Sequence, residues 1–375
     1  MLNGWWMSKM DINPAPVTSG PYTHERSSIN RTMLLVMIAL TPATAFGIYQ
    51  FGLPALFLFV LTIAACVISE AACLAIAGKP VKPYLMDGSA ILTGWLLAMT
   101  LPPWSPWWIG VVGAMLAIIV GKQVFGGIGQ NLFNPAMVAR VALLIAFPLE
   151  MTSWVLPQPM FSASAPGMSE ALGITFVTGT MSAHDAISSA TILGHVKTEL
   201  SQGLLLHDVL ADNYDVFGLA TGSVAGSLGE TSAILILIGG LFLLYMRIIS
   251  WHIPVSMLLT LAVLASLFHL ASPERYPDAI FHLMSGATLL GAFFIATDLV
   301  TSPVTYRGQL VFGAGCGALV FIIRSWTGYP EGVAFAVMLM NALTPLIDHY
   351  MKPRIYGRNR KGDPIQYAED MESPK

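Results

Sequence analysis

Charged residues are scarce in this chain of 375 residues: only 10% are Asp, Glu, Lys or Arg, whereas 55% are hydrophobic. A soluble globular protein is typically about a quarter charged. The formal net charge is −3, so there is no excess of basic residues to attract a polyanion such as nucleic acid. These scarcities argue against a cytosolic enzyme, a disordered protein and a nucleic-acid binder. They predict a chain whose surroundings are mostly lipid.

Cysteine is also sparse, with three residues and no C-x-x-C spacing. Such a set cannot by itself build a zinc or iron–sulfur site, so we predict no metal site and interpret Cys66, Cys73 and Cys316 as apolar packing residues. The N-terminus lacks a compact apolar run that ends in a small-residue cleavage site. The first membrane span is therefore expected to act as the targeting signal.

Long apolar stretches are abundant. A spanning helix needs roughly 20 predominantly apolar residues, and this criterion predicts an all-α integral membrane protein of about ten transmembrane helices. The stretch at 88–101 is short for a full crossing, as expected of a half-helix that lines a cavity. The predicted spans are 32–51, 53–78, 88–101, 107–125, 134–154, 231–249, 254–271, 283–300, 309–326 and 332–350.

The distribution of basic residues orients these spans. Ten spans place both termini on one side, and basic loops favour the cytoplasm. With cytoplasmic termini, only Lys197, Arg275 and Arg324 of the 18 basic residues lie outside, and Arg140 lies within a span. We therefore predict a bacterial inner-membrane protein that has both termini in the cytoplasm. Its expected parts are a cytoplasmic segment (1–31), a first five-helix repeat (32–155), a polar extracytoplasmic segment (156–230), a second repeat (231–351) and a basic cytoplasmic tail (352–375).

The two halves show an internal repeat. The segments 88–101 and 285–298 align at one constant offset, which pairs Gly94 with Gly291 and Thr100 with Thr297. Each segment is followed by a further span, a Gly-rich link and a final apolar span. Because each half holds five spans, the halves must have opposite orientation, as in transporters that build a site near mid-membrane. Chance similarity of Gly/Ala-rich helices is the alternative.

The extracytoplasmic segment contains the stretch Asp185-Ala186-Ile187-Ser188-Ser189-Ala190-Thr191. A threonine hydroxyl among small residues is accessible and can form a stable phosphoester. Runs of Ser, Ala and Thr are common in loops, so composition alone gives this stretch little weight.

Several motifs together carry a family resemblance that reaches from near residue 20 to near residue 357. They are Pro21-Tyr22-Thr23-His24, the 122–137 stretch with Gly126-Gly127-Ile128-Gly129 and Phe133-Asn134-Pro135, Trp251-His252-Ile253-Pro254, Ser285-Gly286-Ala287-Thr288, the 328–336 stretch GYPEGVAFA, and Pro345-Leu346-Ile347-Asp348. With these motifs the sequence resembles the RnfD component of Rnf electron-transport complexes, which is similar to the NqrB component of sodium-translocating NADH:quinone reductases.

The resemblance implies a covalent cofactor. In that family, a threonine that ends an S-x-A-T motif carries FMN through a phosphoester. Thr191 matches this threonine, Ser188 and Ala190 match the motif, and Asp185 stands at its head. Ser189 occupies a position where relatives often have Gly or Gln, which is a mild departure. A second, non-covalent flavin such as riboflavin between the repeats is also implied by the family.

A second S-x-A-T sequence competes for the same role: Ser285-Gly286-Ala287-Thr288. Thr288 aligns with Ile91 of the first repeat, so we interpret this motif as a packing position or a second flavin site. Thr191 is preferred because it lies on a hydrophilic segment that an extracytoplasmic flavin transferase can reach.

Ionisable residues inside spans are functional candidates because their burial in lipid is costly. Glu70 lies well inside the second span and Asp298 near the inner end of the eighth. We interpret both as candidates for an ion pathway, although Asp298 is equally suited to capping a helix end. Arg140 is interpreted as a partner of a buried acid or as a subunit contact.

The resemblance implies a membrane subunit of an ion-translocating oxidoreductase. It would relay electrons through FMN, in a complex that couples electron transfer between ferredoxin and NAD to Na⁺ or H⁺ translocation. The expected partners are the other members of the complex (A, B, C, E and G), membrane lipid and a flavin transferase. The short cytoplasmic loops leave no room for a complete active site on this chain. The alternative is a channel or transporter for a small polar solute, which would need no flavin.

Overall fold

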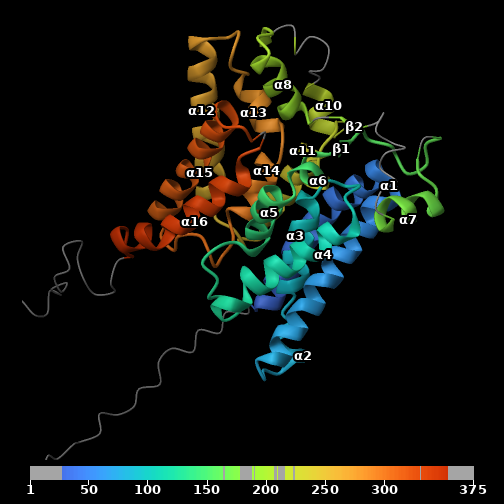
Figure 1. The fold of residues 1–375 in the computed structure, drawn as a ribbon. Helices are drawn as coiled ribbons and strands as arrows, with labels where there is room; N and C mark the ends of the chain where they lie inside the picture. Colours follow the sequence, from blue (N-terminus) through green and yellow to red (C-terminus); the bar gives the residue numbers. More distant parts are fainter. Residues whose placement is uncertain are drawn as a thin grey trace, which may run out of the picture.

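A computed structural model of the chain describes residues 28–163, 165–177, 188–189, 191–206, 209, 216–222, 224–329 and 331–353. These residues are mostly helical (Figure 1). Five segments among them are long and apolar enough to cross a membrane: Ile29–Ile76, Trp107–Phe125, His252–Ala271, Tyr306–Trp326 and Val333–Tyr350. The chain is therefore a mostly helical, multi-pass membrane protein.

The first two predicted spans lie in one long, kinked segment, α1 (Ile29–Ile76). Ser28 caps its N-terminus by accepting a hydrogen bond from the Arg31 amide at 3.2 Å. The helix is interrupted at Gly52, where φ is 75° and ψ is −161°. Pro54 has no amide hydrogen to donate to the Gln50 carbonyl four residues earlier. The Gln158 amide donates to that carbonyl instead, at 2.8 Å, so the loop after the first half stabilises the kink.

The remaining helices of the first half cover the other predicted ranges. Asn134 begins α5 by accepting from the Ala136 amide at 3.1 Å, and Pro135 occupies the first helical turn, where no amide is needed. These elements are α2 (Val81–Leu85), α3 (Ser89–Thr100), α4 (Trp107–Met115), a π-helix η1 (Leu116–Val120), a 3-10 helix η2 (Gln123–Phe125), α5 (Pro135–Ala146) and α6 (Pro148–Thr152).

The second half also has a helix in each predicted range. The range 283–300 is broken into short pieces, because a turn at Ser285–Ala287 separates two helices and a π-helix follows. The elements are α11 (Ala233–Tyr245), α12 (His252–Ala271), α13 (Ala279–Met284), α14 (Thr288–Leu290), the π-helix η6 (Gly291–Ile295), α15 (Tyr306–Trp326) and α16 (Val333–Tyr350). In Figure 1, α12, α15 and α16 lie on one side of the molecule, and α1, α3 and α4 on the other.

Short elements make up the described part of the segment between the halves. They are the strand β1 (Trp154–Val155), α7 (Met168–Phe176), the strand β2 (Ser188–Ser189), α8 (Ile192–Ser201), α10 (Val216–Thr221) and a 3-10 helix η5 (Leu228–Glu230). No strand was predicted from the sequence, but β1 and β2 pair antiparallel, with Trp154 opposite Ser189. Figure 1 shows α8, α10 and α13 at the end of the molecule away from α2.

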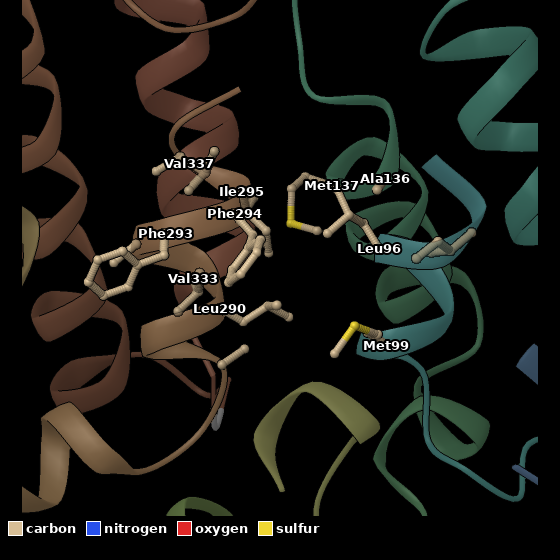
Figure 2. Packing of buried hydrophobic residues seen from close by; sticks show 14 of the residues in the cluster. Leu96, Met99, Ala136, Met137, Leu290, Phe293, Phe294, Ile295, Val333 and Val337 are labelled. Carbon is tan, nitrogen blue, oxygen red and sulfur yellow. The ribbon is translucent and has the colours of Figure 1, made fainter. Parts of the chain in front are cut away.

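Apolar side chains from both halves form one core. Met99 of α3 and Met137 of α5 face Leu290 and Phe294 across the junction between the halves (Figure 2). Leu290 and Met99 have no exposed surface, and Met137 has only 1%. Burying a large apolar side chain is worth about 1.5–3 kcal/mol, so this junction fixes how the two halves sit against each other.

Candidate functional site

Thr191 is the N-cap of α8. Its backbone is extended, and its hydroxyl oxygen accepts a hydrogen bond from the Gly194 amide at 3.1 Å. The residue is only 8% exposed, so the expectation of an accessible hydroxyl is wrong for the folded chain. The reason is that Leu193 and Val196 of α8 pack against Phe281, which draws the start of α8 onto α13.

The motif residues before Thr191 are only partly described. Ser188 and Ser189 form β2, which pairs with β1, whereas Asp185 and Ala190 lie outside the described residues. The pairing brings Ser189 opposite Trp154. The guanidinium carbon of Arg140 lies 5.8 Å from the centre of a Trp154 ring, a distance typical of a cation–π contact. A buried arginine of α5 thus contacts β1, the partner of the strand that precedes Thr191.

The second motif, Ser285-Gly286-Ala287-Thr288, forms the turn between α13 and α14. Arg324 near the C-terminal end of α15 holds this turn by donating to the Ser285 carbonyl at 3.0 Å and to the Thr288 hydroxyl at 2.8 Å. The Ala287 amide donates to a Glu331 carboxylate oxygen at 2.6 Å. Thr288 has no exposed surface, and its hydroxyl is fully engaged in hydrogen bonds.

The turn also has a left-handed residue in tight surroundings. Gly286 has a φ of +64°, and a Cβ atom there would lie 2.8 Å from both Arg324 Nη2 and Leu193 Cδ1. Only glycine meets both the conformation and the space.

The two competing motifs meet at one small cavity. Thr191 lines it from α8, and Ser285 and Gly286 line it from the turn, together with Glu230 of η5. The cavity holds about 10 Å³, roughly one water molecule. The two motifs were weighed as alternatives from the sequence, but the fold makes them neighbours.

Glu230, which lines this cavity, belongs to a buried group of two acids and two arginines. Glu230 accepts from the Ser227 hydroxyl at 2.9 Å and is hydrogen-bonded to Glu331. Burial, and then the neighbouring Glu331, raise the pKa of the Glu230 carboxyl. Both acids act electrostatically on Arg140 and Arg324. Arg140 and Arg324 are 6% and 5% exposed. The predicted roles of Arg140, as a partner of a buried acid or a subunit contact, stay predictions.

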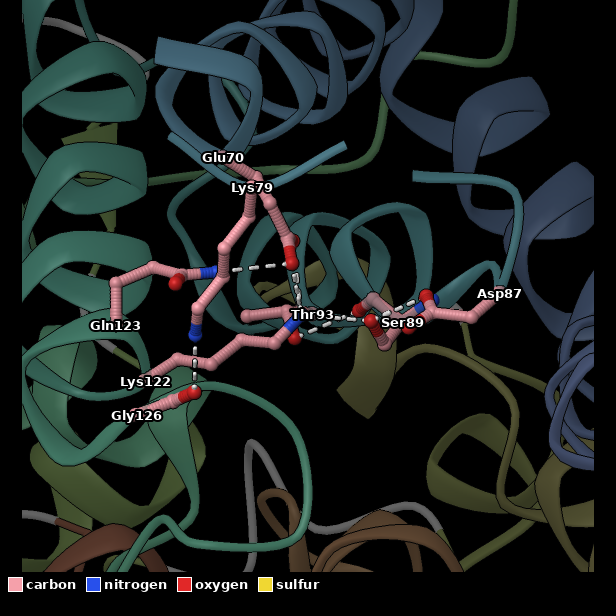
Figure 3. Close-up of polar contacts among 8 residues, drawn as sticks. All are labelled: Glu70, Lys79, Asp87, Ser89, Thr93, Lys122, Gln123 and Gly126. Carbon is pink, nitrogen blue, oxygen red and sulfur yellow. Dashed lines mark hydrogen bonds and ion pairs between the residues drawn. The ribbon is translucent and has the colours of Figure 1, made fainter. Parts of the chain in front are cut away.

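Glu70, a predicted ion-pathway residue, belongs to a separate buried network (Figure 3). The Lys122 ammonium lies 2.6 and 2.8 Å from the two Glu70 carboxylate oxygens and 2.6 Å from the Ser89 hydroxyl. Gln123 also donates to Glu70, at 3.1 Å, and the Ser89 hydroxyl donates to Asp87 at 2.5 Å. Glu70 and Lys122 are each only 2% exposed. The Lys122 ammonium thus lies between these oxygens, where a cation bound by them would otherwise lie.

Asp298, the other predicted ion-pathway residue, accepts hydrogen bonds from the turn that directly follows it. Its carboxylate accepts from the Val300 amide at 3.3 Å and from the Thr301 hydroxyl at 3.1 Å. It shares a cavity of about 90 Å³ with Ser89, Lys122 and Asn134. The Glu70 network and Asp298 therefore border the same space, which lies between the two halves.

Four residues at these sites were given no role from the sequence: Lys122, Glu230, Arg324 and Glu331. Two signals could have found them. Lys122 is a lone lysine at the end of an apolar range, and Glu331 is the acid of the Gly-Tyr-Pro-Glu-Gly stretch. Neither signal reveals the partner, because Glu70 and Lys122 are brought together only by the packing of α1 against the segment that follows α4.

Comparison with known proteins agrees with the sequence motifs. The model of the NQR2, RnfD, RnfE family matches residues 16–357. A relative from Stutzerimonas stutzeri is 56% identical over 344 residues, which cover 92% of this chain and 96% of the relative. One from Halorhodospira halophila is 53% identical over 96% of this chain and 99% of its own length. One from Rhodobacter capsulatus is 50% identical over 81% and 84%.

All three relatives are named as the D component of an ion-translocating oxidoreductase complex. Identity at this level over most of both chains shows that the chain and these relatives share one fold along most of their length. The chain belongs to the NQR2, RnfD, RnfE family.

Proposed function

We propose that this chain is the RnfD component of an Rnf-type ion-translocating oxidoreductase and relays electrons through FMN bound covalently to Thr191. The observation that carries the proposal is the position of Thr191. It ends an S-x-A-T motif, caps a helix, and lines a cavity that it shares with the buried Glu230 and with Ser285 of the turn held by Arg324. The relatives named as members of such a complex support the membership in a complex.

The residues around Thr191 fit a phosphoester. The N-terminus of a helix offers amide hydrogens and a positive dipole end to an anion, and the Gly194 amide already points at the Thr191 oxygen. Arg324, all of whose hydrogen bonds to the described residues go to uncharged oxygens, adds positive charge across the cavity. When bound, a flavin supplies the exchange of one or two electrons. The small cavity at Thr191 is too small for a phosphate, so Leu193 or its neighbours must move outward.

The topology of the proposal follows the charge distribution. Ten spans in two inverted five-helix repeats, with both termini in the cytoplasm, place Thr191 on the periplasmic side of a bacterial inner membrane. The aligned glycines support the repeat, since a Cβ at Gly94 would lie 2.9 Å from the Ile63 Cα, and one at Gly291 would lie 2.4 Å from Val333 Cγ1. Both positions require close helix approach.

The ion path is proposed to pass the cavity between the halves. Asp298 and Lys122, the partner of Glu70, line this cavity, and a buried carboxylate in a membrane span is costly unless it has a use or a partner. In this proposal, the other members of the complex (A, B, C, E and G) supply the ferredoxin and NAD sites, and a flavin transferase esterifies Thr191. The coupling ion is Na⁺ or H⁺. A non-covalent riboflavin between the repeats stays a prediction. The cavity there holds about 90 Å³, less than the roughly 300 Å³ typical of ligand pockets, so it would have to widen to bind a flavin.

The test is flavin fluorescence in a denaturing gel, with the chain produced in a host that has the flavin transferase. The parent and Thr288→Ala should fluoresce, Thr191→Ala should not, and Thr191→Ser should retain a signal because it keeps the hydroxyl and the helix cap. Thr288→Ala is the matched control, since it removes the same hydroxyl from the competing motif. A parent band without flavin fluorescence would refute the covalent flavin and favour the alternative of a channel or transporter.

A further inference from the structure

A larger cavity lies on the other side of Leu193 from the Thr191 hydroxyl. It is formed by one face of α8, the start of α13, the C-terminal end of α15 and the loop before α13, and it holds about 440 Å³. Cavities of roughly 300–1,000 Å³ are typical of sites for small organic molecules. Thr191 itself does not line this space.

Polar groups without partners point to a ligand in this cavity. His282 lines it, is only 3% exposed, and has no hydrogen-bond partner for either ring nitrogen among the described residues. Burial lowers the pKa of His282 to about 3, so its ring is neutral and offers one donor and one acceptor. The Nε of Arg324 is also buried without a partner in the described chain. Buried polar groups are rarely left unpaired.

Three basic residues (Lys197, Arg275 and Arg324), one acid (Glu274) and aromatic residues are also part of the lining. Lys197 donates only to backbone carbonyls, those of Ile323 at 3.3 Å and Tyr329 at 2.7 Å, within the described chain. Burial, and then the nearby Arg324, lower the pKa of Lys197, as expected for a half-buried cation close to a second one. Tyr276 and Trp326 also line the cavity, and the Trp326 indole donates to the Tyr276 hydroxyl at 3.3 Å.

Leu193 and Arg324 separate this cavity from the Thr191 hydroxyl. Leu193 follows Thr191 by two residues and lines both cavities. Arg324 lines the larger cavity and holds the Ser285 carbonyl of the smaller one. Leu193 is therefore the side chain that the linings of the two cavities share.

We infer that the larger cavity receives the isoalloxazine ring of the flavin carried by Thr191, with Lys197, Arg324 and His282 at its polar edge and Tyr276 and Trp326 against its face. This inference rests on the proposed function. Planar aromatic side chains suit a planar ring. The ring gains negative charge when it is reduced. Lys197, Arg275 and Arg324 outnumber Glu274 in the lining, so the excess positive charge favours the reduced form and raises its midpoint potential.

The first test is a redox titration of the purified, flavin-bearing chain with dithionite, followed by absorbance. Lys197→Gln keeps a polar side chain but removes the charge. It should weaken the preference for the reduced form about tenfold, which lowers the midpoint by about 30 mV for a two-electron couple. Lys82→Gln is the matched control, since Lys82 is exposed on α2 at the opposite end of the molecule, and its midpoint should equal that of the parent.

The second test is the fluorescence of the bound flavin in the native protein. A tryptophan in contact with the ring quenches it by donating an electron to the excited state. Trp326→Leu should therefore raise native fluorescence at least twofold, whereas Trp251→Leu should not; both tryptophans are 53% exposed. Fluorescence measured after denaturation gives the amount of flavin in each variant.

The outcomes separate the two proposals. Normal flavin content with an unchanged midpoint in Lys197→Gln and unchanged quenching in Trp326→Leu would place the ring elsewhere and overturn this inference alone. A parent without covalent flavin would overturn both. If Lys197→Gln does not fold, the Trp326→Leu fluorescence decides.

Discussion

Replacing Gly286 by alanine tests whether the turn at Ser285–Ala287 is packed as described. The substitution has two costs. The left-handed conformation costs a non-glycine residue about 1–2 kcal/mol. The new Cβ would also lie 2.8 Å from Leu193 Cδ1 and Arg324 Nη2, so both side chains must shift.

Gly78→Ala separates these costs. Gly78 has almost the same φ, +66°, but no atom of the described residues lies within 4 Å of its Cβ position, so it carries only the conformational cost. Overpacking costs roughly 1–3 kcal/mol, and Arg324 would also lose strength in its hydrogen bonds to Ser285 and Thr288. We therefore expect Gly286→Ala to destabilise the protein by about 2–4 kcal/mol more than Gly78→Ala.

The assay is thermal unfolding of both variants in the same detergent at one scan rate. At about 2 °C per kcal/mol for a large domain, the apparent Tm of Gly286→Ala should fall some 4–8 °C below that of Gly78→Ala. Equal melting temperatures would show that Leu193 and Arg324 do not contact the turn, and the shared cavity of the two motifs would then be wrong.

Three further predictions concern stability. Glu70→Gln leaves the Lys122 ammonium buried without its carboxylate and should cost about 3–5 kcal/mol, seen as a lower Tm; adding Lys122→Met should recover most of the loss, and an additive double mutant would contradict the pair. Because burial lowers the pKa of His282 to about 3 from an ordinary value near 6.5, its neutral form stabilises the fold fully above pH 6.5. That contribution falls by about 1.4 kcal/mol per pH unit below it, so the Tm of the parent should drop more between pH 7 and 5.5 than that of His282→Gln; equal drops would contradict the buried, neutral ring. Asn134→Ala removes the cap of α5 and should cost about 1 kcal/mol; a Tm equal to the parent's would argue against the cap.

Apolar patterning anticipated where helices lie but not how they are interrupted. The predicted boundary between the first two spans falls at Gly52, where α1 is kinked, since glycine and the nearby Pro54 are local signals. The break at Ser285–Ala287 also contains a glycine, Gly286, but one glycine in a Gly-rich apolar stretch is a weak signal. The contacts that hold this turn come from Arg324 and Glu331 on other elements.

The candidate site shows the same limit. The sequence motifs identified Thr191 and Ser285–Thr288 separately. Because both match S-x-A-T, they were treated as alternative sites for the covalent flavin. Their shared cavity, the pairing of Ser189 with Trp154, and the Lys122 partner of Glu70 all depend on contacts between segments far apart in the chain. Periodicity and spacing carry no information about such contacts.

Peptide mass spectrometry of the purified chain tests the central claim most directly. Trypsin places the two candidate threonines in different peptides, 141–197 for Thr191 and 276–307 for Thr288. We predict the mass of a phosphoester-linked FMN on the 141–197 peptide, with fragment ions that assign it to Thr191. The same mass on the 276–307 peptide, or on neither peptide from a host that contains the flavin transferase, would contradict the account.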